Sequence, residues 1–141
     1  MKTLNPSLLL LVISVILITS CKKEDNDSRD KFVGSYSMSE TWTLDGGGSG
    51  TDNYTISISK SNVNSKQILI NNLGNTITAY GAQMNVTATV EGTSLAIETQ
   101  SISLGDYSVT VTGTGSLNDK LLTINYVIVG QWQGQLSGFK Q

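Results

Sequence analysis

Alternation of apolar and polar residues is the feature that most constrains how this chain can fold. It recurs throughout residues 32–141, and no segment there shows the 3.6-residue period of an amphipathic helix. The first stretch, for example, places Tyr36, Met38 and Trp42 on one parity and serine or threonine on the other. A period of two is typical of strands with one face in a core and the other in solvent. The pattern therefore predicts an all-β domain over residues 32–141.

Eight stretches of this kind follow one another along the domain. Their inward parity is expected to be formed by Tyr36, Met38, Trp42 and Leu44; Tyr54, Ile56 and Ile58; Ile68 and Ile70; Met84, Val86, Ala88 and Val90; Leu95 and Ile97; Tyr107, Val109 and Val111; Leu122, Ile124, Tyr126 and Ile128; Trp132 and Leu136. Several connections, at residues 91–93, 117–119 and 130, are short enough for hairpins, so neighbouring strands are expected to pair antiparallel.

Closure of the sheet follows from the need to protect its edges. A meander of eight strands leaves two unpaired edges, and residues 32–141 contain no proline that would block association along them. We therefore predict a small eight-stranded antiparallel up-and-down β-barrel. A two-sheet β-sandwich is the alternative.

The N-terminal 20 residues have the layout of a secretion signal. A basic start at Lys2 precedes an apolar run over residues 8–18, and small residues follow directly before Cys21. This run is shorter than the roughly 20 apolar residues that a membrane-spanning helix needs. We expect residues 1–20 to be a cleaved signal peptide, and the mature protein to have no transmembrane helix.

Residues 17–21 read Leu-Ile-Thr-Ser-Cys and resemble the bacterial lipobox, whose cysteine is acylated and becomes the first residue of the mature protein. This resemblance implies that Cys21 carries lipid and attaches the protein to a bilayer; an ordinary cleaved signal with a free thiol is the alternative. Residues 22–31 carry eight charges in ten positions, so residues 21–31 are predicted to be a lipidated cysteine and a disordered tether. Lysine followed by acidic residues after the cysteine is similar to the signal that sends Bacteroidota lipoproteins to the outer surface of the outer membrane. A spacer on the periplasmic side is the alternative.

Composition excludes several classes of function. Only 14% of residues are charged, with 11 acids and 9 bases, so the chain lacks the basic footprint of a nucleic-acid-binding protein. Histidine is absent and Cys21 is the single cysteine, which excludes disulfides, histidine ligands and imidazole-dependent catalytic triads. The acids of the domain are scattered, and no nucleophile has an evident base beside it. We expect a non-enzyme without metal, and with no cofactor besides the covalent lipid.

The start of the domain, together with the meander, the valine and threonine hairpins and the lipobox, resembles the small lipocalin-like lipoproteins of Bacteroidota. Residues 32–36 read Phe-Val-Gly-Ser-Tyr, and Gly34-Ser35-Tyr36 is similar to the lipocalin Gly-x-Trp, which places an aromatic ring at the barrel floor. The resemblance implies a barrel that binds a small apolar or amphiphilic ligand.

Six residues are the candidates for such a site. Glu40 lies on the apolar parity, where it points into a cavity as a polar anchor unless a bulge or the strand end turns it to solvent. The others are aromatic residues of the inward parity, which line a pocket or fill the core: Trp42, Tyr54, Tyr107, Tyr126 and Trp132. If they fill the core, we expect a structural or interaction module that binds a protein or glycan at the cell surface.

The glycine-rich segment over residues 45–52 is expected to be a mobile flap at one barrel end that gates a pocket. It matches one copy of a calcium-binding repeat, but a single copy leaves the ion half coordinated. A strand rather than a helix is predicted to follow it, which argues against a phosphate-binding loop.

Overall fold

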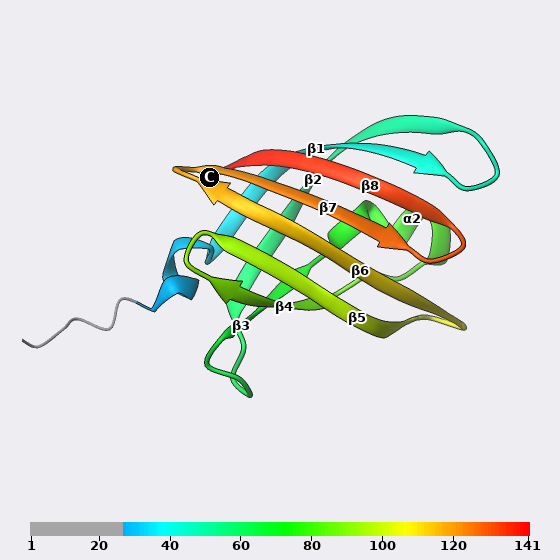
Figure 1. Cartoon of the computed structure of the whole chain (residues 1–141). Coiled ribbons are helices and arrows are strands. Elements are labelled where there is room, and N and C mark those ends of the chain that lie inside the picture. The colour runs from blue at the N-terminus through cyan, green and yellow to red at the C-terminus, as the bar shows by residue number, and fades with distance from the viewer. Residues whose placement is uncertain (1–26) are drawn as a thin grey trace, which may run out of the picture.

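The computed structural model describes residues 27–141, whose eight strands form one closed sheet (Figure 1). The predicted signal peptide, Cys21 and the tether as far as residue 26 lie outside the described residues. The strands are β1 (Gly34–Leu44), β2 (Ser49–Lys60), β3 (Gln67–Asn71), β4 (Val86–Glu91), β5 (Ser94–Leu104), β6 (Tyr107–Asn118), β7 (Leu121–Ile128) and β8 (Trp132–Lys140). Three short helical elements accompany them: η1 (Ser28–Lys31), η2 (Leu73–Asn75) and α2 (Ile77–Tyr80).

Pairing between the first and last strands closes the sheet. β1 pairs antiparallel with β8 from Tyr36↔Lys140 to Leu44↔Trp132, and each other pair joins strands that are neighbours in the sequence. Closure leaves no terminal strand in the ladder for another chain to extend. The predicted eight-stranded up-and-down barrel is confirmed, and the sandwich alternative is wrong because all strands belong to one continuous ladder.

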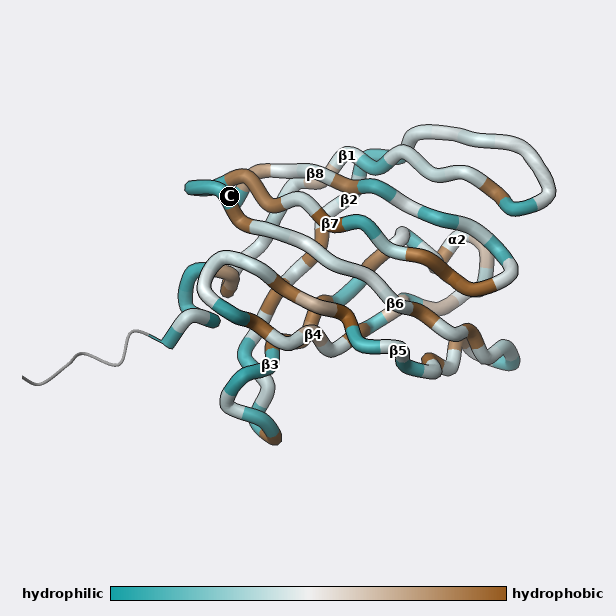
Figure 2. The backbone as a smooth tube through the Cα atoms, in the orientation of Figure 1, coloured by the Kyte–Doolittle hydropathy of each residue, from teal (hydrophilic) through white to brown (hydrophobic). Residues whose placement is uncertain are grey.

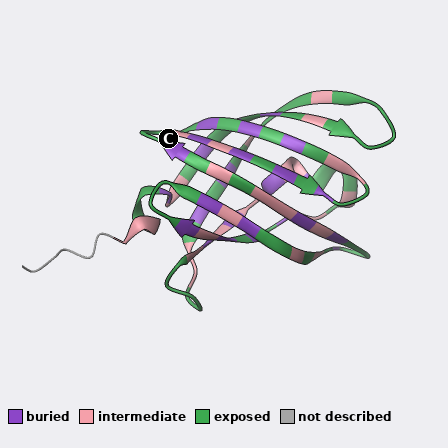
Figure 3. Cartoon of the chain, viewed as in Figure 1, coloured by how far each residue is buried: buried purple, intermediate pink, exposed green. Residues whose placement is uncertain are grey.

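The inward parity of the strands forms one apolar core. Buried and exposed residues alternate along the strands (Figure 3), and hydrophobic residues recur in the same alternating manner (Figure 2). Within the described residues, 23 apolar side chains are buried in a single cluster, and Tyr36, Tyr126 and Phe32 are among the largest. Because an eight-stranded barrel is just wide enough to be filled by side chains, its interior is largely occupied by this core.

The two ends of the barrel are covered by different segments. The entry end carries η1, the loop over residues 61–66 and the C-terminus, whereas the mouth carries the 45–48 turn, the 72–85 segment with α2, and the turns before β6 and β8 (Figure 1). At the entry end, Tyr36 is fully buried and its hydroxyl donates to the carbonyl of Phe32 at 2.9 Å. The ring of Tyr36 therefore closes the core at the entry end.

A row of alternating glycine and aromatic residues crosses five strands near the mouth. Gly113 pairs with Tyr126, Tyr126 with Gly134, Gly134 with Trp42, and Trp42 with Gly50. A Cβ atom at Gly50 would overlap the Trp42 ring, and one at Gly134 would overlap the Tyr126 ring. Glycine inside a strand often marks a site of close approach, and here it makes room for the neighbouring rings.

The ordered domain begins earlier than predicted. Asp27 caps η1 by accepting a hydrogen bond from the Arg29 backbone at 3.0 Å, and Arg29 Nη1 donates to the carbonyls of Ser61 and Asn64 at 3.2 Å each. Lys60 Nζ also pairs with Asp27 at 2.9 Å. The prediction of a disordered tether is therefore wrong for residues 28–31, because composition does not reveal that these charges have partners on β2 and the 61–66 loop.

Arg29→Ala is expected to release η1 without unfolding the barrel. Arg29 ties η1 to backbone carbonyls of the 61–66 loop but contributes nothing to the apolar core. Hydrogen-exchange mass spectrometry should show faster exchange of η1 amides, with an unchanged thermal midpoint. Lys66→Ala, in the same loop, is the control and should leave η1 protected. Unchanged protection of η1 in Arg29→Ala would contradict the assignment.

The connection between β3 and β4 contains helical turns that the alternation does not predict. η2 and α2 span three and four residues, which is too short for a 3.6-residue period to appear in the sequence. Gly81 follows α2 with φ 70°, a left-handed conformation typical of the residue after a helix. No helix in residues 27–141 is long and apolar enough to cross a membrane.

The glycine-rich segment is shorter and better anchored than the predicted flap. β2 already begins at Ser49, so only residues 45–48 form the turn, and Thr43 pairs with Ser49. Leu44 N donates to the carbonyl of Gly48 at 2.9 Å, and Asp45 N donates to the carbonyl of Gln131 at 2.9 Å. The prediction of a flap over residues 45–52 is wrong, because backbone pairing extends the hairpin almost to its tip.

Candidate ligand-binding pocket

Glu40 is buried inside the barrel, with 1% of its surface exposed. β1 keeps a continuous register at this point, because Glu40 pairs with Asp52 on β2 and with Leu136 on β8. No bulge or strand end turns the side chain outward, so the solvent-facing alternative is wrong. The carboxylate therefore needs hydrogen-bond donors within the barrel.

Two tyrosine hydroxyls supply these donors. The Tyr54 hydroxyl donates to Glu40 Oε2 at 2.6 Å, and the Tyr126 hydroxyl donates to Oε1 at 2.5 Å. Each hydroxyl in turn accepts a hydrogen bond, Tyr54 from the Gly74 amide at 3.0 Å and Tyr126 from Trp132 Nε1 at 3.1 Å. The network connects five residues from four strands and η2, and it orients both tyrosine protons toward the carboxylate.

Burial controls the ionisation of this network. It raises the pKa of Glu40 above its usual value, while the hydrogen bonds from Tyr126 and Tyr54 act in the opposite direction. Burial and the neighbouring Glu40 also raise the pKa values of Tyr54 and Tyr126 far above their usual range. Both tyrosines therefore remain protonated donors at ordinary pH, and Glu40 is the acidic member of the network.

A pocket of about 270 Å³ opens beside Glu40 at the mouth. Its walls come from β1, β2, β8 and the segment that carries η2 and α2. The lining residues are Glu40, Trp42, Leu44, Asp52, Gly74, Asn75, Thr76, Thr78, Ala79 and Trp132. A buried carboxylate, a second acid and two indole rings therefore share one concave site.

Both tryptophans of the pocket are held by neighbouring groups. Trp42 Nε1 donates to Asp52 Oδ2 at 3.0 Å, and its ring lies against Gly50. Trp132 stacks on Tyr80 of α2, with ring centroids 5.8 Å apart and an interplanar angle of 21°. The Tyr80 hydroxyl also donates to the side chain of Gln131. These contacts fix the two indoles before any ligand arrives.

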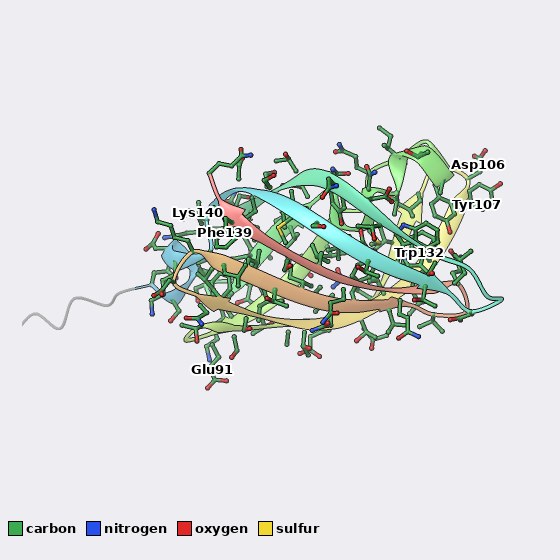
Figure 4. All side chains as sticks on the ribbon, turned by 90° about the horizontal axis from the view of Figure 1, so that it is seen from above. Glu91, Asp106, Tyr107, Trp132, Phe139 and Lys140 are labelled. Carbon is green, nitrogen blue, oxygen red and sulfur yellow. The ribbon has the colours of Figure 1, made fainter. Side chains whose placement is uncertain are left out.

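Tyr107 lies outside the pocket, contrary to the prediction. It is the first residue of β6 and is 62% exposed, and its ring meets Tyr80 edge-on at 5.6 Å. Figure 4 shows it at the same end as Trp132, beyond the closed part of the barrel. The parity of Tyr107 is inward, but the first residue of the strand extends past the core that the parity describes.

The other five predicted site residues come together. Glu40, Tyr54, Tyr126 and Trp132 share the hydrogen-bond network, and Trp42 lines the pocket beside them. Alternation did not identify the contributions of Asp52 or of the 72–85 segment. The only sequence signal for the latter was its turn chemistry, Asn-Asn-Leu-Gly-Asn over residues 71–75, which indicates a loop but not where it lies.

A second concavity, of about 560 Å³, lies on the outer surface of β1, β6, β7 and β8. Its side chains are mainly hydroxyls and amides, without a charged group: Thr41, Thr43, Thr112, Thr114, Asn125, Gln133 and Gln135. Gly113 and Gly134 of the glycine and aromatic row lie in its floor. This outer groove is neutral and rich in hydrogen-bonding groups.

Charged residues are divided between the two ends of the barrel. The six bases of the described chain all lie at the entry end: Arg29, Lys31, Lys60, Lys66, Lys120 and Lys140. Four of the nine described acids, Asp27, Asp30, Glu91 and Asp119, lie there as well, and Glu98 lies midway along β5. The half toward the mouth carries Glu40, Asp45, Asp52 and Asp106 without a base. Figure 4 shows Lys140 and Asp106 at opposite ends. Residues 27–141 contain no group of three or more acids, histidines or cysteines that could hold a metal.

Comparison with known proteins supports the architecture. No protein-family model and no curated protein matches this chain. Among solved structures, it is similar to a redesigned β-barrel, with a TM-score of 0.50 and 10% sequence identity over 82% of this chain and 96% of that chain. At this level of identity, the likeness concerns the barrel fold alone.

Proposed function

We propose that this protein is a non-catalytic lipoprotein of the outer membrane that binds a small amphiphilic ligand in the pocket at the mouth of its barrel. The observation that carries the proposal is the pocket itself. It joins the hydrogen-bonded carboxylate of Glu40 to the fixed rings of Trp42 and Trp132. A concave site that combines aromatic rings with placed polar groups is typical of small-molecule sites.

The volume of the pocket limits the size of the ligand. About 270 Å³ lies just below the range of roughly 300–1,000 Å³ that is usual for small-molecule sites. The packed core leaves little room for a long acyl chain inside the barrel. A head group or a small molecule fits the pocket, and the apolar part of an amphiphile can lie against Leu44, which lines the pocket and is 40% exposed.

The proposed lipid anchor agrees with the distribution of basic residues between the two ends of the barrel. Lipid on Cys21 would connect to the entry end, where the chain enters through η1 (Figure 1). All six described bases lie at this end. Bases near a membrane surface are attracted to anionic lipids. The mouth then faces away from the bilayer, as expected for a surface-exposed member of the lipocalin-like lipoproteins that the sequence resembles.

The anchor and the location have separate tests. Metabolic labelling with palmitate should mark the wild-type protein and be lost in Cys21→Ser. Protease added to intact cells should cleave the barrel if it lies on the outer surface. Resistance on intact cells with cleavage after lysis would place it on the periplasmic side instead.

The outer groove supports a second candidate function, an interaction module that binds a glycan or a protein. Its amide and hydroxyl side chains suit uncharged partners that are rich in hydrogen bonds. In that case Gln133→Ala together with Gln135→Ala should abolish capture of the partner from crosslinked membranes. Ala79→Phe, which changes only the mouth, should leave capture intact.

Ligand binding in the mouth pocket can be followed by intrinsic fluorescence, because both tryptophans of the chain line it. We expect a saturable change with small amphiphiles, and a 1:1 complex by native mass spectrometry of protein purified from membranes. Ala79→Phe should fill the pocket and reduce affinity at least tenfold. Val63→Phe adds the same ring to a loop residue that is 97% exposed and serves as the control. Equal binding by both variants would refute this site.

A further inference from the structure

We propose that the mouth pocket binds an organic cation, an ammonium group with small alkyl substituents, between Trp42, Trp132 and the carboxylates of Glu40 and Asp52. The inference rests on the ligand-binding function proposed above and specifies the chemistry of the ligand's head group. It applies to the same pocket of about 270 Å³.

The charge of the pocket is uncompensated. Glu40 and Asp52 are the acidic residues of its lining, and the lining contains no lysine or arginine. The donors to Glu40 are the neutral hydroxyls of Tyr54 and Tyr126. A buried carboxylate is normally paired with a cation as well as hydrogen-bonded, and here the described bases all lie at the opposite end. A cationic ligand would supply the missing charge.

The two carboxylates are also placed against each other. Glu40 and Asp52 are direct partners in the β1 and β2 ladder, and both line the pocket. Like charges directly opposite in a strand pair destabilise the sheet, and Asp52 raises the pKa of Glu40 further. A cation between the two carboxylates would replace this repulsion with attraction. Relief of the repulsion would therefore add to the free energy of binding.

The indole rings favour an alkylated ammonium over a metal ion. Trp42 and Trp132 line the same pocket, and cations substituted with alkyl groups bind well in aromatic cages. Calcium takes about six to eight oxygen ligands, more than two carboxylates provide. Magnesium gives up its waters reluctantly, and the indole rings offer those retained waters no acceptor oxygen. The hydrogen bonds to Asp52 and Tyr126 hold the two indoles in place, which reduces the entropy lost on binding.

Choline and its neutral carbon isostere, 3,3-dimethylbutan-1-ol, provide the test, because they share a shape and differ in charge. With the full chain purified from membranes in an uncharged detergent, fluorescence and calorimetry at pH 8 should show at least a tenfold preference for choline. Glu40→Gln and Asp52→Asn should each reduce choline affinity at least tenfold and leave the isostere unaffected. Asp106→Asn is the control, because it also removes one negative charge at the mouth but Asp106 does not line the pocket. This variant should retain choline binding.

The outcomes separate this inference from the function on which it rests. Equal affinity for choline and the isostere, or unchanged choline affinity in Asp52→Asn, overturns the cation site. If other amphiphiles then bind and Ala79→Phe blocks them, the pocket function stands. If no small molecule binds, both proposals fail. If Glu40→Gln does not fold, the Asp52→Asn variant and the comparison of the two probes on the wild type still show whether the pocket selects a cation.

Discussion

Gly134→Ala should lower the free energy of unfolding by about 1–3 kcal/mol, the usual cost of overpacking a filled site. A Cβ atom at this position would overlap Glu40 Oε1 and the ring of Tyr126. Neither group can move aside easily, because the carboxylate and the ring are joined by a 2.5 Å hydrogen bond and Trp132 holds the same hydroxyl. Denaturant unfolding monitored by circular dichroism measures the change.

Gly46→Ala is the matched control for this substitution. Gly46 lies in the turn between β1 and β2, and a Cβ atom there would meet no other atom within 4 Å. Its replacement should change stability by less than about 0.5 kcal/mol. If Gly134→Ala were equally neutral, the close packing of the Glu40 network against β8 would be refuted.

The second large effect is a loss of stability as the pH rises. Because burial raises the pKa of Glu40, the folded protein keeps this proton to a higher pH than the unfolded chain does. Unfolding therefore releases a proton between the ordinary glutamate pKa of 4.5 and the raised native pKa, and the free energy of unfolding falls as pH rises through this window. One proton corresponds to a slope of at most about 1.4 kcal/mol per pH unit.

Glu40→Gln isolates this contribution. Glutamine cannot titrate but keeps an oxygen for one tyrosine hydroxyl, so its stability should be flat across the window and exceed that of wild type at the upper end. The pKa of Asp27 is lowered mainly by Arg29 and then by Lys60, so its stabilising contribution is lost only as pH falls below the window. Denaturant titrations from pH 5 to pH 9 compare the two proteins. Parallel pH profiles would show that Glu40 is not the titrating group.

The sequence contained enough local information to predict the strands and much of the barrel. Met38, Ile56 and Ile124 occupy the core because the alternation of each strand places them on one face. Closure could be predicted because an eight-stranded meander without proline has exposed edges to protect. Tyr107 did not follow its parity, since a residue at the start of a strand can extend beyond the core that the pattern describes.

The geometry of the site depends on contacts between residues that are far apart in the sequence. Glu40 is separated by 14 residues from Tyr54 and by 86 from Tyr126, so no local pattern could pair them. The placement of η2 and α2 beside the pocket, and of η1 against the 61–66 loop, also depends on contacts between distant segments.

By itself, the sequence determined the alternation of faces, the antiparallel meander and the residues available for a core, because these depend on neighbours along one strand. Only the tertiary structure decided that Glu40 is buried, that two tyrosines donate to it, and that Asp52, Trp42 and Trp132 share its pocket. The physical reason is that burial and hydrogen bonding are set by the register of paired strands and by closure of β1 on β8, which bring distant residues together.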